Sequence, residues 1–296
     1  MKKTILGKTN AEVSRVVFGG IIVNGETQNG ADRFVSEAVD MGVNFFDVAP
    51  NYGEAEEKLG PALEKYRKNV FLSCKTFEKT ADGARKNLEN SFKMMRTDYF
   101  DLYQLHSLAE VSDVDKVFAK DGAMQVVDEA KKSGRIKHVG ITAHNEETAL
   151  YALTKYDYDT VMFPINWALD LRLNFASRLY SVCADKNIGL IAIKALAHRN
   201  WKDDEERVFP KSWCKTIFNN DSLGVSALKY TLSKGVHTIV PPGNFEQFKF
   251  VVNHIDECCE NPFNENDMKL LKSELPEASE LFFKVTEDKK GTFENR

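Results

Sequence analysis

The sequence has few cysteines, no long apolar run and little net charge. Its 296 residues include five cysteines with no C-x-x-C pair, which predicts a reduced, cytoplasmic protein. The adjacent Cys258 and Cys259 have only His254 close by, so a metal or redox role for this pair is the weaker alternative. No apolar run approaches the roughly 18 residues of a membrane-spanning helix. A formal charge of -4 gives no reason to expect nucleic acid as a partner.

Short apolar runs alternate with amphipathic stretches along most of the chain. The runs predict strands at 16–18, 43–46, 70–74, 100–105, 138–141, 160–163, 190–193 and 237–240. Predicted helices follow at 31–41, 55–66, 82–95, 123–132, from 146, 175–186, 223–233 and 246–254, with one more at 265–274. Eight such units in about 250 residues predict a single α/β domain over 1–296, a closed (β/α)8 barrel.

A doubly wound sheet is the alternative fold. It usually carries a glycine-rich fingerprint after its first strand, and the segment 19–25 (GGIIVNG) lacks the G-x-G-x-x-G pattern. Before the first barrel strand, residues 4–14 predict a small β-hairpin. The widest gap in the pattern is a long loop at 197–218, and residues 286–296 are expected to form a flexible tail.

Four side chains suited to proton chemistry follow three consecutive predicted strands. The segment 42–53 (GVNFFDVAPNYG) ends a strand on Asp47 and presents Tyr52 in the next turn. Lys75 ends the following strand, and His106 ends the one after that. Because active sites of (β/α)8 barrels lie at the carboxyl ends of the strands, we expect these groups to share one rim.

Together these groups can protonate a carbonyl oxygen. A free tyrosine has a pKa of about 10, and a nearby ammonium lowers it by favouring the phenolate. Lys75 supplies that ammonium, while Asp47 keeps it charged and oriented. His106 positions the substrate oxygen, and Tyr52 donates the proton. None of these groups can donate a hydride, so the chemistry requires a nicotinamide cofactor.

Taken singly, each residue also has an ordinary interpretation. Asp47 can cap a turn, Tyr52 can be a rim aromatic, and Lys75 can extend to the surface. His106 can be a barrel histidine without a catalytic role. The placement of all four at matched strand ends favours a site.

Three segments resemble the aldo-keto reductase superfamily. Residues 45–56 (FFDVAPNYGEAE), 70–75 (VFLSCK) and 99–106 (YFDLYQLH) are similar to the family's stretches around its catalytic Asp, Tyr, Lys and His. The resemblance covers most of the chain and is to a divergent bacterial-type branch. It implies NAD(P)H-dependent carbonyl reduction in a (β/α)8 barrel whose bottom is closed by the N-terminal hairpin.

The resemblance also implies where a cofactor would bind. Thr142 corresponds to a hydroxyl residue that binds the nicotinamide carboxamide, whereas Met162 and Ile193 replace a common glutamine and a stacking tyrosine. Lys194 is expected near the pyrophosphate, and Lys249 near a 2′-phosphate. The remaining expected cofactor contacts are Gly20, Ile21, Asp47, Pro242, Gly243, Asn244 and Asn253. NADP is slightly favoured over NAD.

Substrate shape is only weakly encoded. Asn51 and His144 are expected to add polar contacts near the carbonyl. Trp201, Phe209 and Trp213 in the long loop either wall the pocket or form a small core of the loop itself. The segment after the last predicted helix is short compared with the substrate loop of larger relatives, and this implies an open pocket with a broad range of small carbonyl or alcohol substrates.

Two other functions fit the same residues. One is a nicotinamide-binding module with weak turnover, similar to the potassium-channel β subunits of this superfamily. The other is a barrel lyase that uses Lys75 as a Schiff-base nucleophile, which would require an uncharged amine beside Asp47.

Overall fold

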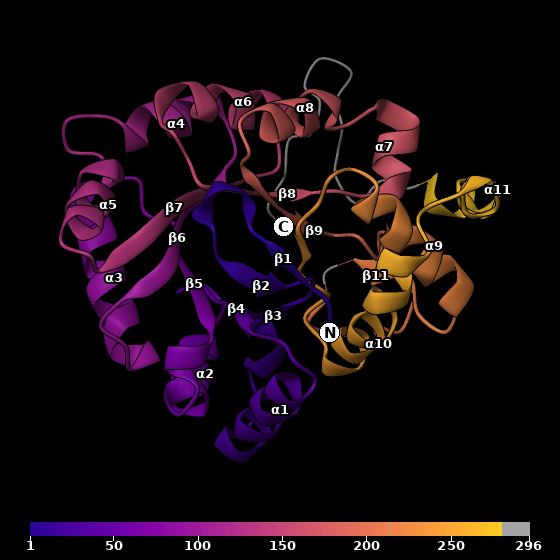
Figure 1. The fold of residues 1–296 in the computed structure, drawn as a ribbon, viewed down its shortest axis with the longest axis horizontal. Coiled ribbons are helices and arrows are strands. Elements are labelled where there is room, and N and C mark those ends of the chain that lie inside the picture. The colour runs from indigo at the N-terminus through magenta and orange to yellow at the C-terminus, as the bar shows by residue number, and fades with distance from the viewer. Residues whose placement is uncertain (213, 280–296) are drawn as a thin grey trace.

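Eight parallel strands form the central sheet of the protein. The computed structural model describes residues 1–212 and 214–279. Within them the strands follow the order β12-β9-β8-β7-β6-β5-β4-β3, and a parallel bridge between Val16 and Ile239 closes the sheet into a barrel (Figure 1). Their bounds are β3 Val17–Gly19, β4 Phe45–Asp47, β5 Phe71–Thr76, β6 Phe100–Leu108, β7 Ile136–Ala143, β8 Thr160–Pro164, β9 Gly189–Ile193 and β12 Thr238–Ile239. The predicted (β/α)8 barrel is confirmed.

Helices surround the barrel, as Figure 1 shows. Their bounds are α1 Gln28–Asp40, α2 Ala55–Glu64, α3 Ala81–Met95, α4 Val111–Val117, α5 Ala123–Lys132, α6 Glu146–Lys155, α7 Trp167–Leu173, α8 Ser177–Asp185, α9 Asp221–Leu232, α10 Phe245–Glu260 and α11 Glu265–Glu274. The sequence did not predict α4 and α7, because each has only 7 residues and shows too little periodicity. No helix within the described residues is long and apolar enough to cross a bilayer.

The barrel interior is filled by alternate residues of the strands. Val17, Phe45, Phe71, Leu102, Met162 and Ile191 form one buried cluster, together with Leu6 and Val13 from the N-terminal hairpin. That hairpin pairs β1 (Lys3–Ile5) with β2 (Glu12–Ser14) across a 3-10 turn and crosses the barrel in Figure 1. It therefore plugs one end of the barrel, as the family resemblance implied.

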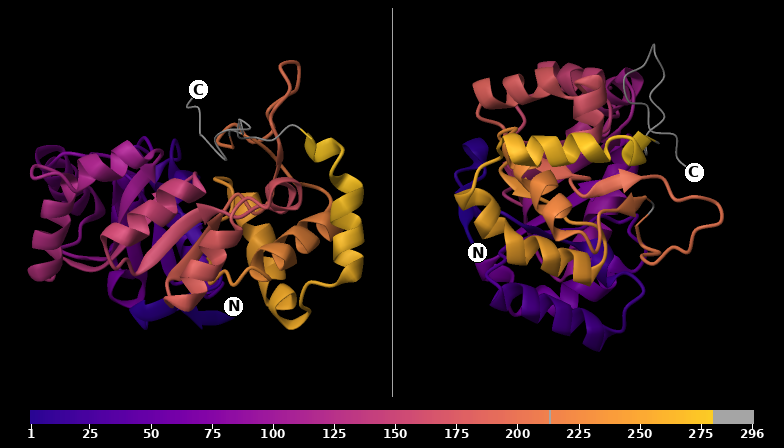
Figure 2. Two further views of the ribbon diagram at one scale, coloured as in Figure 1. Left: turned by 90° about the horizontal axis from the view of Figure 1, so that it is seen from above. Right: turned by 90° about the vertical axis from the view of Figure 1, so that its right-hand side faces the viewer.

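The opposite end carries a feature that the sequence did not predict. Within the expected loop 197–218, β10 (Ala197–Arg199) pairs antiparallel with β11 (Lys215–Thr216). The segment between them projects from the end of the molecule opposite the N-terminal hairpin (Figure 2). Trp213 and the expected tail at 286–296 lie outside the described residues.

Candidate active site

A cavity of about 400 Å³ opens at the carboxyl ends of the barrel strands. Residues on the inward face of a strand recur every second position. Asp47, Thr142, Met162 and Ile193 are inward positions of four strands, and all four line the cavity. Its other lining residues are Gly19, Ile21, Asn51, Tyr52, Phe77, His106, Ser107, His144, Lys194, Ala197, Lys211, Ser212, Cys214, Thr216, Val240, Pro241, Pro242 and Gly243.

Lys75 and Asp47 form a buried ion pair at the base of this cavity. The Lys75 side chain has no exposed surface, and its Nζ contacts Asp47 Oδ2 and donates to the Val48 carbonyl at 3.2 Å. Gln104 donates to Asp47 Oδ1 at 3.2 Å and to Ser73 Oγ at 2.8 Å. The carboxylate is thus fixed from both oxygens, and the ammonium has a charged partner in a dry environment.

Gln104 is a site residue that the sequence analysis missed. It is two positions before His106 on β6, so both project to the inward face. The sequence signal was an amide at an inward position of a largely apolar strand, because a buried amide there needs a polar partner.

Tyr52 lies against both Lys75 and His106. The Lys75 Nζ is 5.0 Å from the centroid of the Tyr52 ring. The rings of Tyr52 and His106 meet edge to face, with centroids 5.8 Å apart and an interplanar angle of 83°. The four residues predicted at the ends of three consecutive strands therefore lie together.

Gly53 fixes the turn that presents Tyr52. Its φ is +61°, and a Cβ there would lie 2.4 Å from Asn24 Oδ1. The same Asn24 oxygen accepts the Glu54 backbone N–H at 3.0 Å. Because a side chain at this position would be strained and would clash, the glycine holds the tyrosine loop against the rest of the rim.

Burial and nearby charges set the protonation states of Tyr52 and Lys75. Burial raises the pKa of Tyr52, and Lys75, which lowers it, does not overcome burial and Asp47. We expected Lys75 to lower the tyrosine pKa; its own effect has that sign, but the net direction is upward. Burial lowers the pKa of Lys75, but Asp47 and Tyr52 outweigh this and the net pKa is raised. The site therefore holds a neutral phenol beside a charged ammonium.

The two cavity histidines are neutral at ordinary pH. Burial, followed by the charge of Lys75, holds the pKa of His106 well below its usual value. Burial and then Lys194 lower the pKa of His144 to about 3. A neutral imidazole can orient a carbonyl oxygen without competing with the phenol as the acid.

Several expected cofactor residues line the cavity. Thr142 Oγ1 accepts the Ser107 backbone N–H at 2.7 Å, which fixes the hydroxyl at the rim. A Cβ on Gly243 would lie 2.2 Å from Ile21 Cγ2, so the glycine permits a close approach of two lining segments. Ile21 belongs to the 3-10 helix Gly20–Val23, which follows β3.

Other expected contacts lie away from the described cavity lining. Gly20 packs on Val48, and Asn244 caps α10 by accepting from the Glu246 backbone N–H at 2.8 Å. Lys249 pairs with Glu246 at 2.9 Å, and Asn253 is exposed on the same helix. No observation tests a cofactor role for these positions, which stay predictions.

The described aromatic residues of the projecting segment do not wall the cavity, which was one of the two alternatives. Trp201 is not part of the described lining; its Nε1 donates to the Ser212 carbonyl at 2.7 Å. Phe209 packs edge to face against Phe218, with centroids 4.7 Å apart. These contacts favour the other alternative, a small core within the segment.

Phe77 and Lys211 are lining residues that the sequence analysis missed. Phe77 lies two positions after Lys75 and meets the His106 ring edge to face at 5.8 Å, so the spacing was a usable signal. Lys211 comes from the projecting segment and donates to the Ile22 carbonyl and to Glu26 Oε1, both at 2.8 Å. Nothing local in the sequence indicates the contact between Lys211 and Glu26, which are 185 positions apart.

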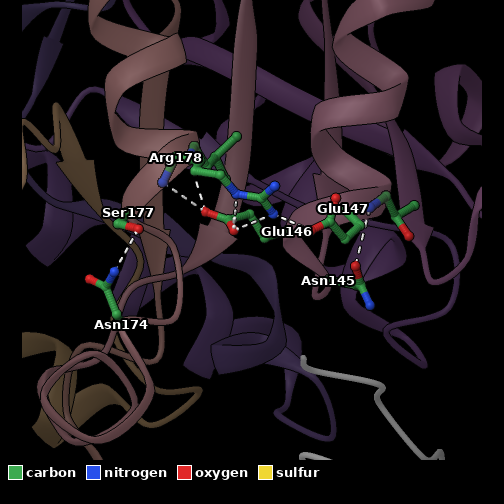
Figure 3. Close-up of polar contacts among 8 residues, drawn as sticks. Asn145, Glu146, Glu147, Asn174, Ser177 and Arg178 are labelled. Carbon is green, nitrogen blue, oxygen red and sulfur yellow. Dashed lines mark hydrogen bonds and ion pairs between the residues drawn. The ribbon is translucent and has the colours of Figure 1, made fainter. Parts of the chain in front are cut away.

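An ion-pair cluster anchors the loop that carries His144 (Figure 3). Glu146 at the start of α6 accepts the backbone N–H groups of Arg178 at 2.9 Å and Leu179 at 3.1 Å, and so caps α8. Arg178 also pairs with Glu146 at 2.8 Å and contacts Glu147. Asn145 caps α6 through the Thr148 N–H at 3.1 Å. The β7–α6 loop is therefore tied down on its helix side.

The described residues show neither a metal cluster nor a disulfide. Within 1–212 and 214–279 no three histidine, cysteine, aspartate or glutamate side chains are arranged to hold a metal ion. All five cysteines are free thiols, Cys258 and Cys259 included.

Comparison with solved structures places the fold. The aldo-keto reductase AKR11C1 from Bacillus halodurans, in its holo form, superposes with a TM-score of 0.72 at 20% identity, over 93% of this chain and 96% of that one. At this identity the likeness concerns the fold.

Sequence comparison gives the family. The aldo-keto reductase YhdN of Bacillus subtilis is 31% identical over 161 residues, which is 48% of this chain and 47% of that protein. L-galactose dehydrogenase of Arabidopsis thaliana is 28% identical over 53% of each chain. The alignments thus span about half the length of these curated relatives. A sequence model of the Aldo/keto reductase family matches residues 15–273. The chain therefore belongs to the aldo/keto reductase family.

Proposed function

We propose that the protein catalyses NAD(P)H-dependent reduction of aldehyde or ketone carbonyls to alcohols, or the reverse reaction, with Tyr52 as the general acid. The observation that carries the proposal is the convergence of Tyr52, Lys75 and His106, with Lys75 Nζ 5.0 Å from the tyrosine ring and the two rings 5.8 Å apart. When bound, a reduced nicotinamide supplies the hydride. The protein supplies the proton and the orientation.

The electrostatics of the site explain how Tyr52 can give up its proton. Negative charge that develops on the carbonyl oxygen makes it basic enough to take the Tyr52 proton. The resulting phenolate lies beside the Lys75 ammonium, which Asp47 keeps charged. A buried pair of opposite charges is stronger than the same pair in water, so the ammonium stabilises the state in which the tyrosine has given up its proton. Neutral His106 donates a hydrogen bond that holds the oxygen.

The residues around the cavity fit a dinucleotide. A rim hydroxyl at Thr142 and an apolar wall of Met162 and Ile193 suit a nicotinamide ring, while Gly243 leaves room beside Ile21. We assign the cofactor contacts to Gly20, Ile21, Asp47, Thr142, Met162, Ile193, Lys194, Pro242, Gly243, Asn244, Lys249 and Asn253. Because Glu246 pairs with Lys249, we expect only a slight preference for NADP, with NAD accepted.

We assign polar contacts with the substrate to Asn51 and His144, with Trp201 bracing the pocket through Ser212. Both Asn51 and His144 line the cavity beside His106, where the carbonyl oxygen would be held. The substrate class is small aldehydes and ketones. The free thiols agree with a reducing, cytoplasmic location.

Two measurements test the proposal. Fluorescence titration with NADPH and NADH gives the nucleotide preference, and a panel of carbonyls read by loss of reduced-nicotinamide absorbance gives the activity. Tyr52→Phe should lower turnover by at least ~100-fold while nucleotide affinity stays nearly unchanged. Tyr151→Phe, on α6, is the matched control and should behave like the wild type.

The outcomes separate the alternatives. Nucleotide binding without turnover of any carbonyl would favour the nicotinamide-binding module. Wild-type turnover in Tyr52→Phe would remove the tyrosine from its role. A lyase that uses Lys75 is disfavoured because the Asp47 ion pair keeps that amine protonated.

A further inference from the structure

His106 lies at an irregularity in β6. The next residue, Ser107, has a φ of +54°, a left-handed conformation that is uncommon for a residue with a side chain. Between Leu105 and Leu108 the strand has two residues, whereas the paired stretch of β7 has only Thr142. One extra residue of this kind is a β-bulge, and bulges beside active sites commonly redirect a side chain.

The bulge changes which side chains of β6 face the barrel interior. Tyr103 and Leu105 belong to the large cluster that strand and helix residues share, so the alternate positions Gln104 and His106 face the other way. Leu108 is two positions after His106 and would continue that inward face in a regular strand, yet it belongs to the same cluster as Leu105. The direction of His106 therefore depends on how the bulge is held.

Two side chains from neighbouring segments hold the peptide group at the centre of the bulge. The Ser107 N–H donates to Thr142 Oγ1 at 2.7 Å. The His106 carbonyl accepts from Lys79 Nζ at 3.1 Å. This carbonyl and this N–H belong to the same peptide group, so both of its polar atoms are fixed, and a hydrogen bond from an ammonium is among the stronger ones.

The imidazole ring has no comparable hydrogen bond at Nδ1. That atom is buried and has no hydrogen-bond partner within the part of the chain that the structure describes. The ring instead meets Tyr52 and Phe77 edge to face, with both pairs of centroids 5.8 Å apart. Lys79 Nζ lies 5.1 Å from the centroid of the Phe77 ring. One ammonium thus contacts the backbone of His106 and an aromatic ring that packs against its side chain.

The chain around Lys79 is itself fixed. The Ala123 backbone N–H, at the start of α5, donates to the Lys79 carbonyl at 2.8 Å. The next residue, Thr80, forms an antiparallel bridge with Gly122. Lys79 is partly buried and is not part of the described cavity lining. Its ammonium is therefore held from outside the site and directed at the bulge.

We propose that Lys79 is a positioning residue for His106. Its ammonium fixes the peptide group that follows the histidine and so keeps the imidazole directed at the substrate oxygen. The inference rests on the proposed function in that His106 orients a carbonyl. Lys79 touches neither substrate nor reacting atoms and acts through the histidine.

The first test compares three lysine variants in carbonyl reduction. Lys79→Met removes the donor and should lower kcat/KM by at least ~10-fold, because small misplacements of an orienting group are costly. The affinity for NADPH and NADH, read by fluorescence, should stay unchanged. Lys79→Arg keeps a charged donor and should restore most of the loss. Lys86→Met, at an exposed position of α3, is the control and should behave like the wild type.

A double-mutant cycle asks whether the effect passes through His106. In the His106→Gln background, Lys79→Met should cause no further loss of kcat/KM. A second loss of ~10-fold in that background would show that Lys79 acts independently of the histidine and would overturn the proposal. Lys79→Ala removes the same donor and takes the place of Lys79→Met if that variant does not fold.

The decisive readout is the imidazole itself, measured by ¹⁵N NMR in the nucleotide-free protein. The ring signals of His106, assigned with His106→Gln, should shift in Lys79→Met and return in Lys79→Arg, while those of His254 on α10 stay in place. Unchanged His106 signals in Lys79→Met overturn the proposal, even if activity falls. A protein that reduces no carbonyl but shows the His106 shift would refute the proposed reductase and leave the contact between Lys79 and His106 as the one that orients the ring.

Discussion

At the scale of single residues, the site depends on which groups stay neutral. Tyr52 is kept as a phenol by burial, and His106 is kept as an imidazole by burial and by Lys75. Lys75 stays charged because Asp47 and Tyr52 together outweigh its desolvation. The sequence predicted these four residues because each ends a strand or follows one, but it did not predict the net direction of the tyrosine pKa. Burial depends on what surrounds the ring, which strand-end spacing does not reveal.

The low pKa of His106 predicts that kcat/KM stays constant as the pH falls from about 8 to 5. A group with an ordinary histidine pKa of about 6.5 would gain a proton between about pH 8 and pH 5 and would then repel Lys75. With its pKa well below that value, His106 stays neutral over this range, so kcat/KM for carbonyl reduction should not fall. A profile of kcat/KM against pH checks this. An inflection near pH 6.5 that disappears in His106→Gln would contradict the assignment.

At the scale of elements, the alternation of strands and helices could be predicted from the sequence, whereas the short β10–β11 pairing could not. Strands such as β8 and β9 are covered on both faces, as parallel strands of a barrel are, and appear in the sequence as nearly unbroken apolar runs. The pairing of β10 with β11 joins residues on either side of a long segment, and only two or three residues form each strand. Such pairings leave no periodic signal.

The projecting segment is tied across the cavity by Lys211, and this predicts an effect on nucleotide exchange. The Lys211–Glu26 pair is partly exposed, so we expect it to contribute about 0.5–1 kcal/mol. Lys211→Met should therefore speed nucleotide dissociation by about 2- to 5-fold. Stopped-flow fluorescence measures the rate, and Lys202→Met, in the same segment but outside the described lining, is the control. Equal dissociation rates in the two variants would show that the pair does not hold the segment.

At the scale of the whole molecule, one end of the barrel is plugged and the other is open. The hairpin fills the bottom with Leu6 and Val13, and the cavity occupies the top. The barrel interior therefore acts as a packed floor for the site and not as a channel. The hairpin and the eight-unit barrel were both predictable, because they follow from hydrophobic patterning. The tie between Lys211 and Glu26 was not, because it depends on how distant loops meet.

The plug predicts a stability effect that is separate from activity. Leu6→Ala removes a fully buried side chain and should lower the free energy of unfolding by about 2–5 kcal/mol. Ile5→Ala, at a neighbouring position that is 51% exposed, should cost much less. Urea denaturation of both variants tests the claim. Equal losses would mean that the hairpin does not plug the barrel.

The most direct test of the central claim is a single turnover with a carbonyl and nicotinamide deuterated at the transferred position. The account predicts deuterium on the carbinol carbon of the alcohol, at a rate that Tyr52→Phe lowers by at least ~100-fold. An alcohol without deuterium at that carbon, or equal rates in the two proteins, would contradict it.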